Sequence, residues 1–220
     1  MTAFIFDLDG TLIDSVYAHV LAWQEALADF DVSVDAWRIN RRIGMSGGMM
    51  LQALSNELNC EVRPEMAKQM EKRHSELIEN FRSKCRPLRG AVALLQSLRA
   101  DGIPFGIATS GNRPGIDPSL LALGIPDDTV VIEGKNSPHG KPEPDELLRC
   151  QQKLQVEPEE CFVVGDAVWD LLAASRARMF SIGLLTGGYA PSELFEAGAH
   201  RVFADPAELL SSLYQLGLHS

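Results

Sequence analysis

The sequence predicts an α/β protein in which a doubly wound parallel sheet carries an inserted all-helical domain. The first observation is a set of short apolar runs, each ending in small or acidic residues, at 3–9, 105–110, 130–134, 161–166, 179–185 and 201–205. The second is that helical patterns separate these runs from about residue 86 onward, whereas residues 16–85 contain no convincing strand. Strands that are buried on both faces and alternate with helices form parallel sheets with right-handed crossovers.

The helices between the predicted strands have recognisable starts and ends. Leu94, Leu95 and Leu98 keep one apolar face until Gly102 ends the helix. Pro206 directly follows Asp205, as a first-turn proline follows a capping residue. Both patterns favour a Rossmann-like layer of helices around the sheet.

The insert follows the first strand and shows two long amphipathic patterns. One consists of Val16, Val20, Trp23 and Leu27, and the other follows Pro64 with Met66, Met70, His74, Leu77 and Phe81. We therefore predict a core domain from residues 1–15 and 86–220 and a helical cap from residues 16–85. The cap is expected to lie over the end of the first strand.

Charge and cysteine spacing exclude several function classes. The 220 residues carry a formal net charge of −10, which opposes nucleic acid or an anionic membrane as a partner. No apolar run approaches the ~18 residues of a membrane span, so we expect a cytoplasmic protein. The four cysteines have neither CxxC nor Cys/His spacing, which argues against a zinc site.

Four aspartates follow predicted strands, where ligands bind in open parallel sheets. Asp7 and Asp9 end the first run, and Asp166 ends the run at 161–166, with Asp170 one helical turn later. Asp7 and Asp9 point to the same side if the strand persists, and a turn after Asp7 would change this. Clustered carboxylates repel one another unless a cation neutralises them, and all-oxygen ligands favour Mg²⁺.

Groups suited to phosphate accompany the aspartates. Thr109 ends the second core run, and Lys141 lies in the proline-stiffened segment HGKPEPD. A lysine and a hydroxyl group next to a magnesium site provide donors for phosphate oxygens. The residues therefore predict a site that handles phosphate.

These motifs resemble the haloacid dehalogenase superfamily, and the match spans almost the whole chain. The four matching features are DLDGT at 7–11, Thr109, Lys141 in GKPEPD and GDAVWD at 165–170. The segments DSVYAHVLAW at 14–23 and RRIGMSGG at 41–48 are similar to the helical-cap subgroup of phosphoglycolate phosphatases and sugar-phosphate phosphatases and mutases.

The resemblance implies a role for each core residue. Asp7 is expected to attack phosphorus and to bind Mg²⁺, forming an aspartyl-phosphate. Asp9 is expected to act as general acid and base with a pKa nearer neutrality than that of a free aspartate, and to bind the metal through its backbone carbonyl. Asp166 and Asp170 complete the metal site, Asp170 as ligand or support. Thr109 and Lys141 hold the transferring phosphoryl group.

The expected substrate is a small phosphorylated metabolite, such as phosphoglycolate or a sugar phosphate. Candidate substrate-binding residues in the core are Gly10 and Ser110. Those in the cap are His19, Arg42, Ser46 and Arg73.

A sugar-phosphate mutase is an alternative function, since His19 matches a cap histidine of such enzymes. Those mutases place an arginine just after the serine of the RIGMSGG segment, where this chain has Gly47 and Gly48. Arg41 or Arg42 is a candidate substitute, although a hydrolase is the simpler interpretation. Phosphonate-cleaving relatives need a Schiff-base lysine in the cap, and no cap lysine lies in a matching segment.

Two functions from other classes also fit parts of the sequence. The segment GMSGG matches the nucleophile elbow of serine hydrolases, but charged WRINRR replaces the strand that the elbow requires. Receiver domains also combine aspartates, magnesium and a lysine, but they phosphorylate an aspartate on the third strand and have no cap. Asp7 lies on the first predicted strand, and Asp9 is present to hydrolyse the intermediate, which favours the hydrolase.

Overall fold

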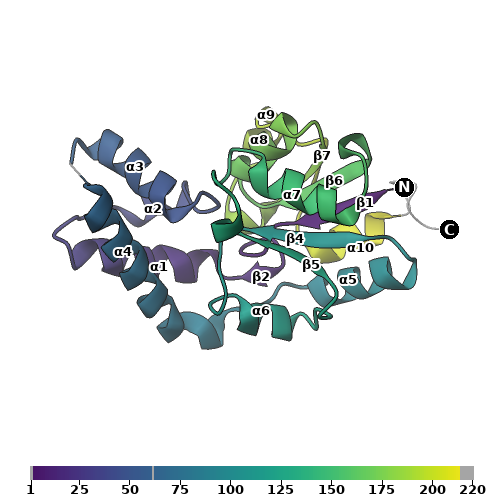
Figure 1. Ribbon diagram of the computed structural model, residues 1–220, viewed down its shortest axis with the longest axis horizontal. Coiled ribbons are helices and arrows are strands. Elements are labelled where there is room, and N and C mark those ends of the chain that lie inside the picture. Colours follow the sequence, from purple (N-terminus) through teal and green to yellow (C-terminus); the bar gives the residue numbers. More distant parts are fainter. Residues whose placement is uncertain (1, 61, 214–220) are drawn as a thin grey trace.

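The computed structural model describes residues 2–60 and 62–213 and contains the predicted doubly wound sheet (Figure 1). Six strands pair in parallel in the order β5-β4-β1-β6-β7-β8. They are β1 (Ala3–Phe6), β4 (Phe105–Thr109), β5 (Val130–Glu133), β6 (Cys161–Gly165), β7 (Phe180–Leu184) and β8 (Arg201–Phe203). All six correspond to the predicted apolar runs.

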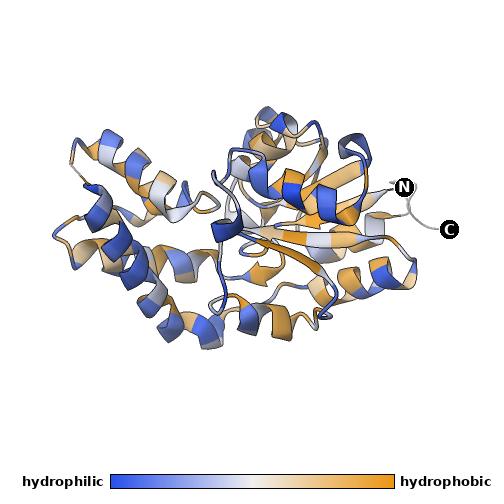
Figure 2. Ribbon diagram, viewed as in Figure 1, coloured by the Kyte–Doolittle hydropathy of each residue, from blue (hydrophilic) through white to orange (hydrophobic). Residues whose placement is uncertain are grey.

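Helices cover both faces of the sheet because the strands are apolar on both. In β1, Phe4 and Phe6 face a core shared with α5 (Ala91–Ala100), α6 (Asp117–Ala122) and α10 (Pro206–Ser212). Ala3 and Ile5 face the opposite core, shared with α7 (Asp145–Leu154) and α8 (Val168–Arg176). A further helix, α9 (Pro191–Glu196), packs beside β7 and β8. Figure 2 shows the strands as mainly hydrophobic between helices with mixed faces.

Two predicted helix signals act as expected. The carboxylate of Asp205 accepts a hydrogen bond from the backbone N–H of Glu208 at 3.0 Å, which caps α10. The chain leaves α5 through Gly102, whose φ of 67° is the left-handed conformation that glycine adopts freely. These local signals fix where the covering helices begin and end.

A helical unit, residues 16–84, projects from one side of the sheet (Figure 1). It contains α1 (Val16–Ala28), α2 (Ala36–Asn40), α3 (Gly47–Leu58), α4 (Pro64–Leu77) and a 3₁₀ segment (Ile78–Lys84). Trp23 and Leu27 of α1 share an apolar core with Met70 and Leu77 of α4, separate from the cores that cover the two faces of β1. The unit therefore has an apolar core of its own.

The helical unit joins the rest of the chain through a two-stranded connection. β2 (Ile13–Asp14) and β3 (Arg86–Pro87) pair antiparallel, so the outgoing and returning segments lie side by side. Neither these strands nor α2 and α3 were predicted. The predicted core range 86–220 includes residues 214–220, which lie outside the described part. Among residues 2–60 and 62–213, every helix is too short or too polar to cross a membrane.

Candidate active site

Three strand ends bring the predicted core residues to one edge of the sheet. Asp7 follows β1 and continues its pairing, since its N–H donates to the Val164 carbonyl at 2.9 Å. Thr109 is the last residue of β4, and Asp166 follows β6. Parallel strands expose their carboxyl ends at a common edge, which explains why residues so distant in sequence meet.

The carboxylates of Asp7, Asp166 and Asp170 form a buried cluster. Each offers an oxygen, and these oxygens lie within 4.8 Å of one another. Burial raises the pKa of Asp7 to about 7, although Lys141 opposes this rise. Burial also raises the pKa of Asp166 well above its ordinary value, reinforced by Asp170 and Asp7. The cluster therefore favours protons or another cation over three separate negative charges.

Lys141 enters this cluster from the loop before α7. Its ammonium nitrogen lies 2.5 Å from Asp7 Oδ1 and 2.8 Å from Asp170 Oδ1, and it donates to the Ala108 carbonyl at 3.1 Å. Burial lowers the pKa of Lys141, but the charges of Asp170 and Asp7 outweigh burial, so the pKa lies above its ordinary value. Lys141 is thus a fixed positive charge beside the Asp7 carboxylate.

The donor set fits a hard divalent cation. Within the described residues the cluster offers only carboxylate oxygens, and one lysine does not balance three aspartates. Thr11 and the Ala167 N–H each hold one of these carboxylates, at 2.8 Å from Asp166 Oδ1 and 3.1 Å from Asp170 Oδ2. Hydrogen-bonded carboxylates with oxygen-only chemistry suit Mg²⁺ better than zinc.

Gly10 allows the chain to turn tightly against this cluster. Its φ is 88°, and a Cβ atom there would lie 2.3 Å from Asp166 Oδ2. Any side chain at position 10 would therefore displace the Asp166 carboxylate. Asp7 continues the pairing of β1, whereas Asp9 lies beyond a bend at Leu8, so the two side chains do not lie on one continuous strand.

The turn directs the Asp9 carboxylate away from the cluster and toward the helical unit. Its Oδ1 accepts a hydrogen bond from Ser15 Oγ at 2.6 Å and lies 3.4 Å from His19 Nε2. Burial raises the pKa of Asp9, but His19 and Ser15 outweigh it and lower the pKa below its ordinary value. The resemblance implies a pKa of Asp9 nearer neutrality, whereas in this structure the pKa of Asp9 is lowered instead.

A cavity of about 780 Å³ lies between the helical unit and the sheet edge. Predicted site residues on its wall are Asp7, Asp9, His19, Arg42, Ser46 and Ser110. Arg42 also pairs with Glu57. Ser46 is the N-cap residue of α3, without a side-chain cap hydrogen bond, and it follows the short helix α2. The strand that a serine nucleophile elbow needs is therefore absent from this described segment.

Two of the predicted site residues, Arg73 and Thr109, do not line the cavity. Arg73 Nε donates to Asp29 Oδ2 at 2.6 Å on an exposed face of the helical unit. Thr109 is buried, and its Oγ1 accepts a hydrogen bond from the Gly111 N–H at 3.0 Å behind the strand end. The structure therefore separates Arg73 from the other predicted site residues.

Several residues at the site were not predicted. Thr11, which holds Asp166, was visible in the DLDGT motif but received no role. Glu146 on α7 is fully buried, both of its carboxylate oxygens lack a hydrogen-bond partner among the described residues, and its charge acts on Lys141. Glu71 and His74 of α4 line the cavity. No local sequence signal distinguishes Glu71 from the solvated glutamates of the same helix.

The helical unit also contacts the core through the backbone carbonyl of Arg41. This oxygen accepts hydrogen bonds from Tyr189 at 2.9 Å and from Trp169 Nε1 at 3.1 Å. The Arg41 guanidinium lies 4.1 Å from the centre of the Tyr189 ring and pairs with Glu193. These contacts join the helical unit to the core.

Comparison with known proteins agrees with the motifs. Residues 1–178 match the model of the haloacid dehalogenase-like hydrolases. The beta-phosphoglucomutase of Bacillus subtilis (strain 168) is 31% identical over 194 residues, covering 85% of this chain and 84% of the relative. Hexitol phosphatase A of Escherichia coli (strain K12) is 32% identical over 184 residues, covering 79% and 78%. The phosphoglycolate phosphatase of Vibrio vulnificus (strain YJ016) is 31% identical over 214 residues, covering 93% and 92%.

A solved structure extends this similarity over the whole chain. A hydrolase from Pseudomonas syringae superposes with a TM-score of 0.96 and 42% identity, covering 100% of both chains. The family model, the sequence relatives and this structure agree on one assignment. The chain belongs to the haloacid dehalogenase-like hydrolases.

Proposed function

We propose that this protein is a Mg²⁺-dependent phosphatase that hydrolyses the phosphate monoester of a small metabolite through an aspartyl-phosphate. The observation that carries the proposal is that two carboxylates line the same cavity in different surroundings. Asp7 lies in the cluster with Asp166, Asp170 and Lys141, whereas Asp9 faces the same cavity from outside that cluster. A nucleophile and a separate proton carrier are what phosphate ester hydrolysis requires.

In the first half-reaction an Asp7 carboxylate oxygen attacks phosphorus. The bond between phosphorus and the ester oxygen breaks as the new bond to Asp7 forms. Asp9 is proposed to carry a proton at this stage, against the lowered pKa that His19 and Ser15 give it in the arrangement without substrate, and to give that proton to the departing alkoxide. Halide departure needs no such proton, so Asp9 favours phosphate esters over haloacids as substrates.

In the second half-reaction water attacks phosphorus of the aspartyl-phosphate. Asp9, now a carboxylate, takes a proton from that water as the oxygen bonds to phosphorus. The bond between phosphorus and Asp7 breaks, which releases phosphate and restores the Asp7 carboxylate. One residue thus serves as acid and then as base.

The remaining core residues stabilise charge on the phosphoryl group. Asp7, Asp166 and Asp170 would hold Mg²⁺, and bound Mg²⁺ supplies positive charge for the phosphoryl oxygens. Lys141, Thr109, Ser110 and the backbone at Gly10 are proposed to position that group. We further propose that residues 16–85 form the cap domain and residues 1–15 and 86–220 the catalytic core, with the cap excluding water from the cavity.

A sugar-phosphate mutase is the second candidate, and the similarity to a beta-phosphoglucomutase supports it. A mutase returns the phosphoryl group from Asp7 to another hydroxyl of the bound sugar instead of to water. The two functions differ in the product: a phosphatase releases inorganic phosphate stoichiometrically, whereas a mutase yields an isomeric phosphate ester.

Phosphate release from a panel of sugar phosphates, polyol phosphates and phosphoglycolate, with and without Mg²⁺, tests the proposal. We expect release only with Mg²⁺, and a loss of at least about 10³-fold in Asp7→Asn, since the nucleophile is removed. Asp14→Asn, an exposed aspartate in β2, is the matched control and is expected to keep full activity. Metal-independent release, or full activity in Asp7→Asn, contradicts the proposed function.

A further inference from the structure

Glu71 occupies the cavity wall where the helical unit approaches the substrate space. A Cβ atom at Gly47 would lie 2.9 Å from Glu71 Oε1 and 3.2 Å from Trp23 Cζ2. A Cβ atom at Gly48 would lie 3.4 Å from the same carboxylate oxygen. The Glu71 carboxylate therefore fills the space that a Cβ atom at position 47 would need.

The Glu71 carboxylate has unused hydrogen-bonding capacity. Within residues 2–60 and 62–213, no side chain or backbone N–H donates a hydrogen bond to it and no cation lies within ion-pair distance. Burial raises the pKa of Glu71, against a lowering by the charge of Lys68. A partly buried carboxylate that faces a cavity without a donor is an acceptor for hydroxyl groups of a ligand.

The cations of the helical unit on this cavity already face carboxylates. Arg42 pairs with Glu57, and Lys72 Nζ lies 3.9 Å from Glu76 Oε1. The charge of Lys68 acts on Glu71 itself. Lys68 is the one lysine or arginine on this cavity without an ion pair among the described residues, so a second phosphate or a carboxylate on the substrate would be repelled by Glu71 and would compete with it for Lys68.

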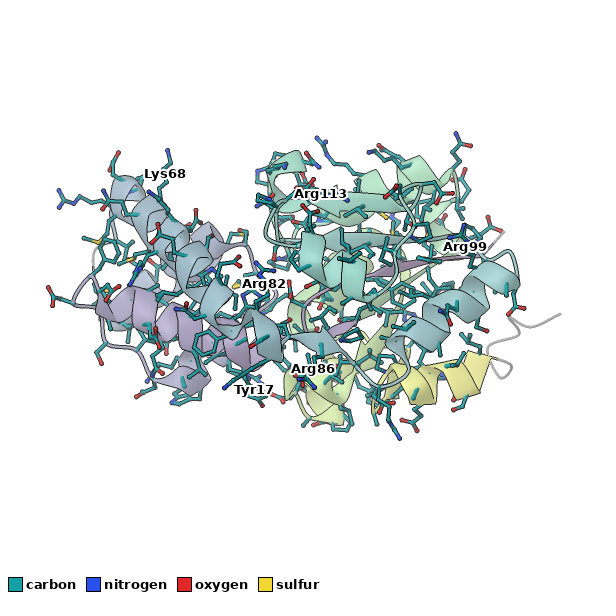
Figure 3. The ribbon with its side chains drawn as sticks, turned by 90° about the horizontal axis from the view of Figure 1, so that it is seen from below. Tyr17, Lys68, Arg82, Arg86, Arg99 and Arg113 are labelled. Atoms are coloured by element: carbon teal, nitrogen blue, oxygen red, sulfur yellow. The ribbon has the colours of Figure 1, made fainter. Side chains whose placement is uncertain are left out.

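On the core side of the cavity, Arg113 is likewise paired with carboxylates. Arg113 lies 3.4 Å from Asp117 Oδ1 and 3.9 Å from Glu133 Oε1. Figure 3 shows Lys68 on the helical unit and Arg113 on the core, on opposite sides of the space that both residues line. Arg113 is thus paired with acidic neighbours, whereas Lys68 forms no ion pair among the described residues and acts on Glu71 through its charge alone.

We propose that Glu71 selects phosphate monoesters whose alcohol part is an uncharged polyol, and that it disfavours substrates with a second anionic group. Hydroxyl groups of the polyol donate hydrogen bonds to the carboxylate, whereas a second phosphate or a carboxylate is repelled. This assignment rests on the proposed function, because it places the phosphate at Asp7 and the alcohol part toward α4. It makes Glu71 the specificity-determining residue of the helical unit.

Ligand binding in the Asp7→Asn background tests the proposal without turnover. Calorimetry with Mg²⁺ compares glucitol 6-phosphate, an uncharged polyol ester, with fructose 1,6-bisphosphate and phosphoglycolate. We expect the polyol ester to bind most tightly. Adding Glu71→Gln is expected to shift the ratio of Kd values toward the anionic ligands by about fivefold or more, since one charge at close range is removed. Glu65→Gln, on the same helix but exposed and away from the cavity, is the matched control and should leave the ratio unchanged.

An unchanged ratio in Glu71→Gln overturns the proposal, as does tighter binding of the bisphosphate or phosphoglycolate with Glu71 intact, or no binding of the polyol ester. Failure of the proposed function gives a different result. The polyol ester would then bind with Glu71-dependent selectivity, while the wild-type protein would release no phosphate from it.

Discussion

His19 Nε2 lies 3.4 Å from Asp9 Oδ1, and the other ring nitrogen of His19 lies 3.1 Å from His74 Nε2. His74 in turn stacks on Trp23 with ring centres 4.2 Å apart. Burial lowers the pKa of His74 well below its ordinary value, with the charge of His19 adding to the effect. The helical unit therefore reaches the proposed acid and base through a chain of aromatic side chains, and its position affects the ionisation of Asp9.

Replacing His19 should change the pH dependence of hydrolysis. Since His19 and Ser15 lower the pKa of Asp9, His19→Asn is expected to raise that pKa. Asp9 must be protonated in the first half-reaction, so the basic limb of kcat/KM should move to higher pH. The pH profile for a polyol phosphate measures this shift. His139→Asn, in an exposed loop, should not move the limb, and a basic limb unchanged by His19→Asn would show that Asp9 is not the acid.

Mg²⁺ should stabilise the protein more at pH 8 than at pH 5. The raised pKa values of Asp7, about 7, and Asp166 favour the protonated folded state. Their stabilising contribution is fully present below the ordinary aspartate pKa and is lost as pH rises through about 7. Bound Mg²⁺ replaces the protons, so saturating Mg²⁺ should raise Tm by about 5–10 °C at pH 8 and by less at pH 5.

Thermal unfolding at the two pH values, with and without Mg²⁺, measures this effect. Asp166→Asn removes one proposed metal ligand and should abolish most of the increment. An equal increment at both pH values, or one that survives in Asp166→Asn, would place the cation elsewhere.

Glu146→Gln should stabilise the protein, and more so as pH rises. Burial is the main cause of the raised pKa of Glu146, and its oxygens lack hydrogen-bond partners among the described residues. The wild-type protein thus loses stability above the ordinary glutamate pKa, whereas the glutamine variant does not. We expect the variant to gain about 1–3 kcal/mol in free energy of unfolding at pH 8 relative to pH 5. Urea unfolding measures this gain, with Glu157→Gln, an exposed glutamate, as the control.

Tyr189→Phe should loosen the contact between the helical unit and the core. The buried hydroxyl group donates to the Arg41 carbonyl, and its loss is expected to lower the free energy of unfolding by about 1 kcal/mol. Urea unfolding compares this variant with Tyr17→Phe, whose side chain is exposed. Equal stability of the two variants would mean that the Tyr189 hydroxyl group contributes nothing to this contact.

The fold was predictable because its main signals are local. Six apolar runs gave the strands, and the alternation of Phe4 and Phe6 with Ala3 and Ile5 follows from burial on both faces. The short strands β2 and β3 contain two residues each, too few for a periodic pattern to appear. The helix α3 begins with Gly47 and Gly48, poor helix formers whose presence reflects the space taken by Glu71 and Trp23.

The site was predictable only where residue type and motif order carried the information. Asp7, Asp166, Asp170 and Lys141 meet because parallel strands share an edge. The direction of the Asp9 side chain depends on the turn after β1, and the pKa of Asp9 depends on His19 of the helical unit. Such distant contacts leave no periodicity or spacing in the sequence.

Trapping the phosphorylated residue tests the proposed chemistry most directly. Asp9→Asn should still accept the phosphoryl group from p-nitrophenyl phosphate, whose leaving group needs no proton, but should hydrolyse the aspartyl-phosphate slowly. Borohydride reduction after rapid quenching converts an aspartyl-phosphate to homoserine, which peptide mass spectrometry locates. We expect homoserine at position 7 only with substrate and Mg²⁺, and none in the Asp7→Asn/Asp9→Asn variant. Phosphate release without modification of Asp7, or modification at another residue, would contradict the role of Asp7 as the nucleophile.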